Sequence, residues 1–363
     1  MIRIDEIYNN TFLPWLLKNQ PGTRLFYCDP PGNTDPSSLF NLGPAGINDK
    51  DYVFFHDQEP VWLDLHEPLF NDVKRRNDDI FCKPPGHIVV SERGEYVDKL
   101  CEKYGWTTHY YFFHGWACQD WFRGYDKTFL IPRARDRAPT QTFISPNRIV
   151  AGKRDHRVLF LYNIFKQGLA HNWISAPRTC VYENVDISVV ASKYNNIYLD
   201  IEQVFVDADL PKLFPGEQTQ EMASCWLTNF DEATDSLVYV PTETVYFGRR
   251  QHITEKTFKA IALEMPFVLV APVHSLEYLR SYGFKTFSSV FDESYDEETD
   301  GIKRIERVTT LLKELNSLSA KEQLQIHRAC LPAVEHNYNH FYRGGLTDLL
   351  WKELTEMLNG LCS

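Results

Sequence analysis

Short apolar runs alternate with helical segments along most of the chain, and this alternation is typical of α/β proteins. In the N-terminal part, four runs rich in β-branched or aromatic residues predict buried strands: RLFYCD (24–29), DYVFFHD (51–57), HIVVSE (87–92) and HYYFFHG (109–115). Between the last two runs, RGEYVDKLCEKYG (93–105) has apolar residues at helical spacing and ends on a glycine. Strand, helix and strand in this order predict a parallel sheet with crossover helices.

A second α/β pattern follows a polar, proline-containing stretch at 131–141, which we interpret as an interdomain linker. Predicted strands lie within 142–150, 236–243, 266–272 and 285–292. Predicted helices lie within 156–168, 253–265 and 274–283, and the chain is helical in pattern from Ile302 onward.

These patterns predict three parts: an α/β lobe at 1–140, a second α/β lobe at 141–330 and a helical tail at 331–363 that packs back on the first lobe. A chain of 363 residues is comfortable for two domains. Two such lobes suit a ligand cleft between them, at the carboxyl ends of parallel strands.

Charge and cysteine content exclude some classes of function. The net charge of −11 makes general binding to a nucleic-acid backbone unfavourable. No apolar run approaches the roughly 20 residues of a membrane span, and Asp5 and Glu6 occupy positions where a signal peptide is apolar. The eight cysteines form no CxxC pair and no zinc spacing. We therefore expect a cytoplasmic protein with reduced thiols and no metal site.

The segment YFGRRQHITEKTF predicts a helix that begins with Thr254 as N-cap and carries Glu255 and Lys256 in its first turn. A lysine is unfavourable at the positive end of a helix dipole, but a bound anion would reverse that effect. Free backbone N–H groups, Lys256 and the upstream Arg249 and Arg250 would hold a diphosphate, while Glu255 would accept hydrogen bonds from ribose hydroxyls. The alternative is a surface helix start with a solvated lysine.

A second candidate lies in a basic region. From Trp121 to Arg157 the chain has nine basic and three acidic residues. Asn147 and Arg148 follow a predicted strand, and Arg157 lies at the start of a predicted helix, so cations point where an anion would bind. The alternative is a basic, solvated linker.

Two further segments carry candidate chemistry. His56, Asp57 and Glu59 follow a predicted strand, where a carboxylate or the histidine would deprotonate an acceptor hydroxyl; the alternative is a cap for the next helix. The segment FHGWACQDWFRGYD (113–126) mixes aromatic and polar residues and would form a stacking platform for a sugar or base; the alternative is an amphipathic core helix.

Two acidic patterns are weaker candidates for metal binding. Asp207 and Asp209 match the DxD pattern of metal-dependent sugar transferases, but three-residue patterns often occur by chance. The run FDESYDEETD (291–300) is more consistent with a solvated loop than with a metal site.

At this point the residues resemble a known family. HITEKTFKAIALEMPFVLVAP, followed by SLEYLRSYGFKTFSSVFDESYDEE, resembles the donor-binding lobe of GT-B glycosyltransferases, and is similar to fucosyltransferase-like enzymes and to a group of tailed-bacteriophage glycosyltransferases. Those families share a TEK or similar pair at a helix start, in which the glutamate faces the ribose and the lysine faces the diphosphate. The phage group also has patterns similar to HDQEP (56–60), DWFRGYD (120–126), SPNR (145–148) and HR (156–157).

The resemblance implies an α/β protein of GT-B fold, with an acceptor-binding first lobe, a donor-binding second lobe and the helical tail. It implies an inverting, metal-independent glycosyltransferase that uses a nucleoside-diphosphate sugar and needs no other cofactor. Glu59 and Pro60 look like the fucosyltransferase base element without its intervening serine, so Asp57 remains a rival for the base. The candidate donor-binding residues are Asn147, Arg148, Arg157, Tyr246, Arg249, Thr254, Glu255 and Lys256.

The sequence leaves the acceptor open. A phage enzyme would glycosylate either a glycan or hydroxymethylated pyrimidines in DNA, and the basic region at 121–157 keeps the DNA alternative. Two further alternatives on the same fold are a non-catalytic protein that binds nucleotides or carbohydrates, and a sugar phosphorylase.

Overall fold

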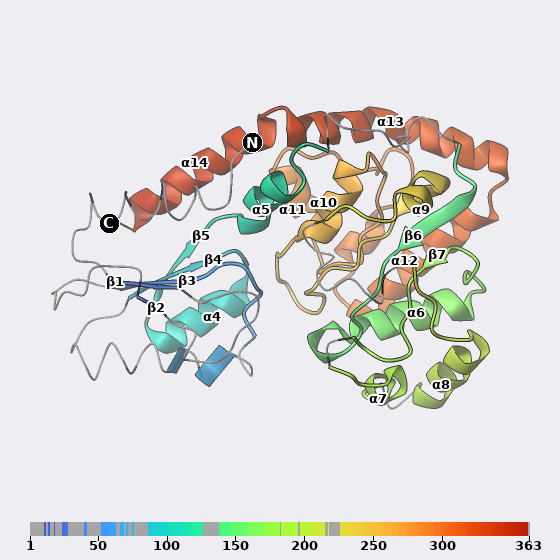
Figure 1. Ribbon diagram of the computed structural model, residues 1–363, viewed down its shortest axis with the longest axis horizontal. Coiled ribbons are helices and arrows are strands. Elements are labelled where there is room, and N and C mark those ends of the chain that lie inside the picture. Colours follow the sequence, from blue (N-terminus) through green and yellow to red (C-terminus); the bar gives the residue numbers. More distant parts are fainter. Residues whose placement is uncertain are drawn as a thin grey trace. The chain divides into compact units, whose positions relative to one another are not determined.

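The computed structural model of the chain (Figure 1) describes residues 24–27, 40–41, 52–62, 86–125, 138–181, 183–194, 197–214 and 226–361, with some single positions outside these ranges. The chain forms two compact units. Unit 1 comprises Met1–Asp120, Arg249–His252 and Leu346–Ser363, and unit 2 comprises Trp121–Gly248 and Ile253–Gly345.

The division differs from the predicted boundaries at 140 and 330. Unit 2 begins at Trp121, the tail joins unit 1 only from Leu346, and the short segment Arg249–His252 returns to unit 1 in the middle of the second lobe. This segment returns because Gln251 and Arg93 exchange backbone hydrogen bonds of 2.8 and 3.0 Å. The predicted linker lies largely outside the described residues.

Unit 1 is built on a five-stranded sheet of order β2-β1-β3-β4-β5, which is parallel except for the edge strand β2. Its strands are β1 (Arg24–Tyr27), β2 (Phe40–Asn41), β3 (Tyr52–His56), β4 (His87–Val90) and β5 (Thr107–Tyr110). Helix α4 (Glu95–Tyr104) connects β4 to β5 and lies below the sheet in Figure 1. It buries Val97 and Leu100 against Ile88 and Val90, as its helical spacing predicts.

The predicted strand at 109–115 is wrong in its second half. β5 ends at Tyr110, and helix α5 (Phe113–Trp121) begins three residues later. All of its residues from Phe113 to Gln119 are buried, and a continuous apolar run does not distinguish a buried helix from a strand.

The C-terminal helix α14 (Gly345–Gly360) lies above the sheet in Figure 1 and packs on α5. The rings of Trp116 and Trp351 meet edge to face at 4.8 Å between centroids, and a Cβ on Gly115 would lie 3.0 Å from Leu350. Trp116 therefore belongs to the core, and the alternative of a core helix, not a stacking platform, describes 113–121.

Unit 2 contains a parallel sheet of order β7-β6-β8: β6 (Gln141–Ser145), β7 (Trp173–Ile174) and β8 (Ser236–Tyr239). Phe267–Val270 extends it beside β8 through parallel bridges to Tyr239 and Thr242. Two helices begin in the loops that follow strands: α6 (His156–Lys166) after β6 and α10 (Glu255–Ala262) after β8.

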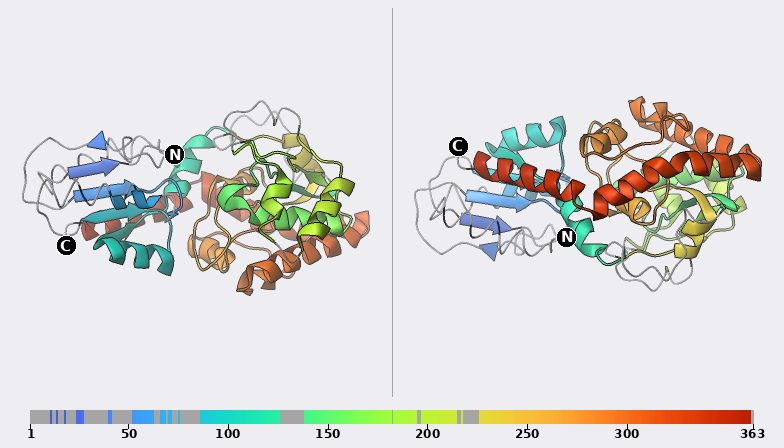
Figure 2. Two further views of the ribbon diagram at one scale, coloured as in Figure 1. Left: turned by 90° about the horizontal axis from the view of Figure 1, so that it is seen from below. Right: turned by 90° about the horizontal axis from the view of Figure 1, so that it is seen from above.

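The other helices that the structure describes in unit 2 are η4 (Gly152–Arg154), α7 (Ile187–Ala191), α8 (Tyr198–Asp207), α9 (Phe230–Asp235), α11 (Ser275–Ser281), η5 (Ser294–Glu297), α12 (Gly301–Ser317) and α13 (Ala320–Tyr342). Of these, α9 and α12 pack on the sheet, and α7 and α8 pack on α6. The long helix α13 runs along one side of the unit (Figure 2) and packs on α10, with the rings of Phe258 and Phe341 5.5 Å apart.

The predicted strand at 285–292 is wrong, because these residues form irregular backbone with one turn at 288–290. Phe287 is buried against Phe267 at 5.0 Å, and its backbone N–H donates to the Glu293 carboxylate at 2.6 Å instead of to a strand. None of the helices that the structure describes is long and apolar enough to cross a membrane.

Candidate functional site

The N-terminus of α10 carries the predicted cap and charges. Thr254 lies in extended conformation before the helix, and its hydroxyl oxygen accepts the Lys256 backbone N–H at 3.5 Å. Glu255 and Lys256 follow in the first turn, with 11% and 26% of their side chains exposed. The cation therefore lies at the positive end of the helix dipole, where only an anion gains from the dipole.

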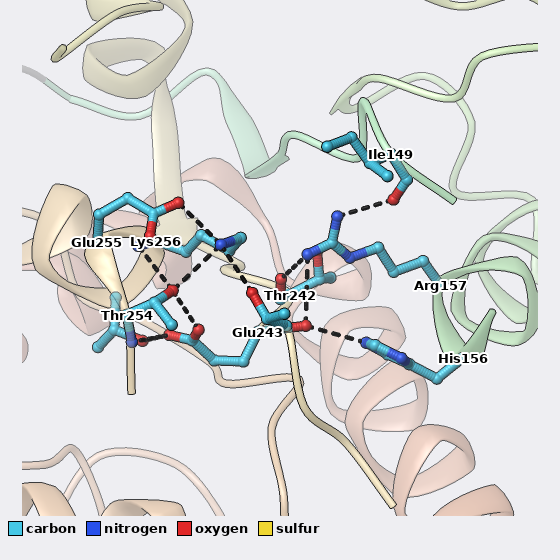
Figure 3. Close-up of polar contacts among 10 residues, drawn as sticks. Ile149, His156, Arg157, Thr242, Glu243, Thr254, Glu255 and Lys256 are labelled. Carbon is cyan, nitrogen blue, oxygen red and sulfur yellow. Dashed lines mark hydrogen bonds and ion pairs between the residues drawn. The ribbon is translucent and has the colours of Figure 1, made fainter. Parts of the chain in front are cut away.

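The Lys256 ammonium group has three acceptors around it (Figure 3). Its Nζ donates to Glu255 Oε1 at 2.8 Å, to Thr254 Oγ1 at 3.1 Å and to Thr244 Oγ1 at 3.2 Å. An ammonium group has three hydrogens, so this set uses each of them once. A phosphate oxygen that binds Lys256 would therefore replace one acceptor, and Glu255 is the one whose charge a phosphate reproduces.

A residue that the sequence analysis did not identify lies beneath this helix start. Glu243 follows β8 and is fully buried, and its carboxylate accepts hydrogen bonds from Thr254 N at 3.2 Å, Thr254 Oγ1 at 2.5 Å and Thr257 Oγ1 at 2.6 Å. The sequence signal was a charged residue between two threonines directly after the apolar run LVYVP, although a glutamate in such a place is usually exposed.

The start of α6 lies next to Glu243. His156 is buried, stacks on Tyr246 at 4.8 Å, and places Nε2 3.1 Å from the Glu243 carbonyl oxygen. Because a carbonyl only accepts, Nε2 carries the hydrogen. Burial, and then the neighbouring Arg157 charge, keep the pKa of His156 well below its usual value, so the ring is neutral.

Arg157 holds backbone in place. Its guanidinium group donates to the carbonyl oxygens of Ile149 at 2.8 Å, Thr242 at 2.6 Å and Glu243 at 3.3 Å, and only 3% of the residue is exposed. Burial lowers the pKa of Arg157 to about 9. The sequence hypothesis that Arg157 binds a diphosphate is therefore corrected: irregular backbone after β8 requires donors, and Arg157 supplies them.

Two other predicted binding residues are also occupied inside unit 2. The Asn147 side chain is buried, donates to Ser145 and accepts from Thr242 Oγ1 at 2.8 Å. Tyr246 is 2% exposed, and its hydroxyl donates to the Gly301 carbonyl oxygen at 2.7 Å. Both side chains position the loops around Glu243 and have their polar atoms turned inward.

The three remaining arginines divide into different environments. Arg148 is half-buried in unit 2, whereas Arg249 is exposed in unit 1. Arg250 is buried in unit 1, where it pairs with Glu92 through Nε–Oε1 and, at 2.7 Å, NH2–Oε2, so it is not available to a phosphate.

The candidate bases lie in unit 1 after β3. Asp57 is 2% exposed and accepts the Tyr111 hydroxyl, whereas Glu59 is half-buried. Burial, and then the charge of His66, lower the pKa of His56 to about 3, which makes this histidine a poor base at neutral pH. Glu59 is therefore the more accessible of the two carboxylates.

We expect unit 1 to lose stability in acid because two of its histidines are buried and neutral. Burial lowers the pKa of His109 to about 4, and its ring nitrogen lies 2.9 Å from His87. Between the unfolded pKa of about 6.5 and the lower pKa of the folded state, the unfolded chain binds more protons than the folded chain. The free energy of unfolding therefore falls as the pH is lowered, by about 2 kcal/mol per histidine at pH 5. Amide hydrogen exchange of β4 at pH 7 and pH 5 measures this loss.

His109→Gln should reduce that loss by about 2 kcal/mol. Replacement of the exposed His171 of unit 2 by glutamine is the control and should leave it unchanged. An undiminished loss in His109→Gln would show that another group causes it.

The described residues contain no group of three or more histidine, cysteine, aspartate or glutamate side chains arranged to hold a metal ion. Asp207 lies at the end of α8 and accepts from Gln203 at 2.8 Å, and Asp209 follows in left-handed conformation.

Comparison of the chain with protein-family models, with curated proteins and with solved structures gave no match.

Proposed function

We propose that the protein is a glycosyltransferase that uses a nucleoside-diphosphate sugar, with unit 2 as the donor-binding unit. The observation that carries this proposal is the pair Glu255 and Lys256 at the start of α10, held by two threonine hydroxyls. A lysine that lies at the positive end of a helix lowers helix stability unless an anion binds there.

The chemistry assigned to the pair follows from its charges. The Lys256 ammonium group and the first backbone N–H groups of α10 would neutralise the leaving diphosphate, which develops charge as the glycosidic bond breaks. A phosphate oxygen that binds Lys256 would displace Glu255 Oε1 from the ammonium group, and ribose hydroxyls would donate to the displaced carboxylate. Diphosphate and ribose binding would therefore support each other.

The rest of the reaction belongs to the same proposal. A carboxylate of unit 1, Glu59 or Asp57, would deprotonate the acceptor hydroxyl. The GT-B arrangement, the inverting outcome, the absence of a metal requirement and the choice between a glycan and a hydroxymethylated DNA base as acceptor follow from the resemblance of the TEK segment and its neighbours. The β6–α6 and β8–α10 connections of unit 2 agree with a nucleotide-binding α/β unit.

A binding screen tests the donor assignment. GDP, UDP, ADP and CDP, with the corresponding nucleotide sugars, are added to the wild-type protein while thermal unfolding is followed. A ligand at 100 times its dissociation constant adds about 2.7 kcal/mol and raises the unfolding midpoint by a few degrees. We expect one nucleotide series to give this shift, and Lys256→Ala and Glu255→Ala to abolish it.

Lys313→Ala is the matched control, because Lys313 is an exposed lysine of the same unit. It should keep the full shift. If no nucleotide shifts the wild-type protein, or if Lys256→Ala and Lys313→Ala respond equally, the donor assignment is wrong. Once the nucleotide is known, transfer to glycans and to hydroxymethylated DNA identifies the acceptor class.

A further inference from the structure

We infer that Glu243 is a positioning residue that holds Lys256 in place through the hydroxyl of Thr254. We call the chain of contacts from Glu243 through the Thr254 hydroxyl to Lys256 the relay. What Lys256 binds rests on the proposed function, but the relay rests on contacts within unit 2. The Glu243 side chain is fully buried, so it would contact neither the ribose nor the diphosphate of a bound donor.

The direction of the relay follows from the hydrogens available. The Thr254 hydroxyl oxygen is approached by Lys256 N at 3.5 Å and Lys256 Nζ at 3.1 Å, and both groups only donate. The single hydroxyl hydrogen must therefore point to its third neighbour, Glu243 Oε2, at 2.5 Å. Glu243 thereby orients the Thr254 lone pairs toward Lys256.

The other oxygen of Glu243 fixes the carboxylate. Oε1 accepts from the Thr254 backbone N–H at 3.2 Å and from Thr257 Oγ1 at 2.6 Å. Both oxygens accept hydrogen bonds, and the backbone carbonyl of the same residue is held by His156 and Arg157 (Figure 3). The carboxylate is thus fixed in position from three sides, as a positioning group requires.

Glutamine has the shape of glutamate but does not reproduce this pattern. If its NH2 group takes the place of Oε2, it donates to Thr254 Oγ1, and the Thr254 hydrogen turns toward the Lys256 ammonium group. If the NH2 group takes the place of Oε1, it faces the Thr254 backbone N–H, donor against donor. The first orientation removes the support of Lys256 directly. The second keeps the bond from the Thr254 hydroxyl but places a donor against the Thr254 backbone N–H, which displaces the start of α10 that carries Lys256.

Thr257 provides a matched control for Thr254. Both hydroxyls bond the same buried carboxylate, but only Thr254 also contacts Lys256. Thr254→Val and Thr257→Val each remove one hydroxyl bond from Glu243, and only the first interrupts the relay and removes the cap on Lys256 N. Thr254→Ser keeps the hydroxyl and should rescue it.

The first experiment needs no ligand. Competitive acylation of lysine amines, measured by mass spectrometry, compares the labelling rate of Lys256 with that of the exposed Lys313. We expect Glu243→Gln and Thr254→Val to raise the relative rate of Lys256 about tenfold, the effect of losing one hydrogen bond to a charged group. Thr257→Val and Thr254→Ser should leave it within about twofold. Equal effects of Thr254→Val and Thr257→Val, or no effect of Thr254→Val, would overturn the relay.

The second experiment links the relay to the ligand. Calorimetry with the nucleoside diphosphate found in the screen should show Glu243→Gln binding about tenfold more weakly than wild type. In the Lys256→Ala background the same substitution should change affinity less than about twofold. Additive effects would overturn the relay. If wild type binds no nucleoside diphosphate, the proposed function fails while the labelling result still decides the relay.

Discussion

Glu59→Gln is expected to lower kcat about a thousandfold, the loss that follows removal of a general base. A base must contact the acceptor hydroxyl, and of the two carboxylates after β3 only Glu59 is more than marginally exposed. Nucleotide affinity should not change, because Glu255 and Lys256, which carry the donor proposal, lie in unit 2 and Glu59 lies in unit 1. Initial rates with the identified donor and acceptor, together with calorimetry, measure both quantities.

Asp57→Asn gives the contrasting result. Asp57 is buried and accepts the Tyr111 hydroxyl, so we expect its replacement to reduce the stability of unit 1 more than the rate per folded molecule. Glu95→Gln, at an exposed glutamate of the same unit, is the control and should change neither. Asp57 would be the base if Glu59→Gln kept most of the activity and a folded Asp57→Asn protein lost it.

The helices and the cap that were predicted correctly are determined by residues close together in the sequence. α4 and α10 follow from apolar residues at helical spacing, α6 from an apolar segment closed by a glycine, and Thr254 from the preference of threonine for N-caps. The start of α10, with Glu255 and Lys256, was therefore located without a structure.

The residues that the sequence misassigned are polar groups bonded across the fold. Asn147 and Arg157 were candidates for ligand binding because polar residues in loops after strands often bind ligands, yet both satisfy interior backbone or side-chain groups. Glu243 was missed because its partner Thr254 lies 11 residues away in a segment without periodicity. Such contacts depend on tertiary packing, which local patterns do not encode.

Replacement of either partner in the buried pair of Glu92 and Arg250 is expected to lower the free energy of unfolding of unit 1 by about 3–5 kcal/mol. Glu92 is 2% exposed and Arg250 7% exposed, and the carboxylate also accepts the Val61 backbone N–H at 3.0 Å. Arg250 in turn donates to the Val61 carbonyl oxygen at 2.7 Å and lies against the ring of Trp62. Each partner, if left alone, would be a buried charge without compensation.

The pair Glu95 and Lys99 on α4 is the matched control. It has the same charges at 3.2 Å, but both side chains are 75% exposed, so Glu95→Ala should change stability by less than about 0.5 kcal/mol. Hydrogen exchange of the β4 amides compares these variants within unit 1 alone. An equal response of Glu92→Ala and Glu95→Ala would show that the buried pair does not stabilise the unit.

The segment Arg249–His252 belongs to unit 1, although the 128 residues Trp121–Gly248 separate it from the preceding part of that unit. A pair as stabilising as Glu92 and Arg250 explains why the segment returns there. One bidentate ion pair, one bond to Val61, two aromatic contacts and the backbone exchange with Arg93 fix a four-residue segment. The Arg250→Met variant, which keeps an apolar stem against Trp62 and Tyr96, should therefore lose β4 protection while unit 2 amides at α12 keep theirs. Loss of protection in both units would mean that the segment stabilises more than unit 1.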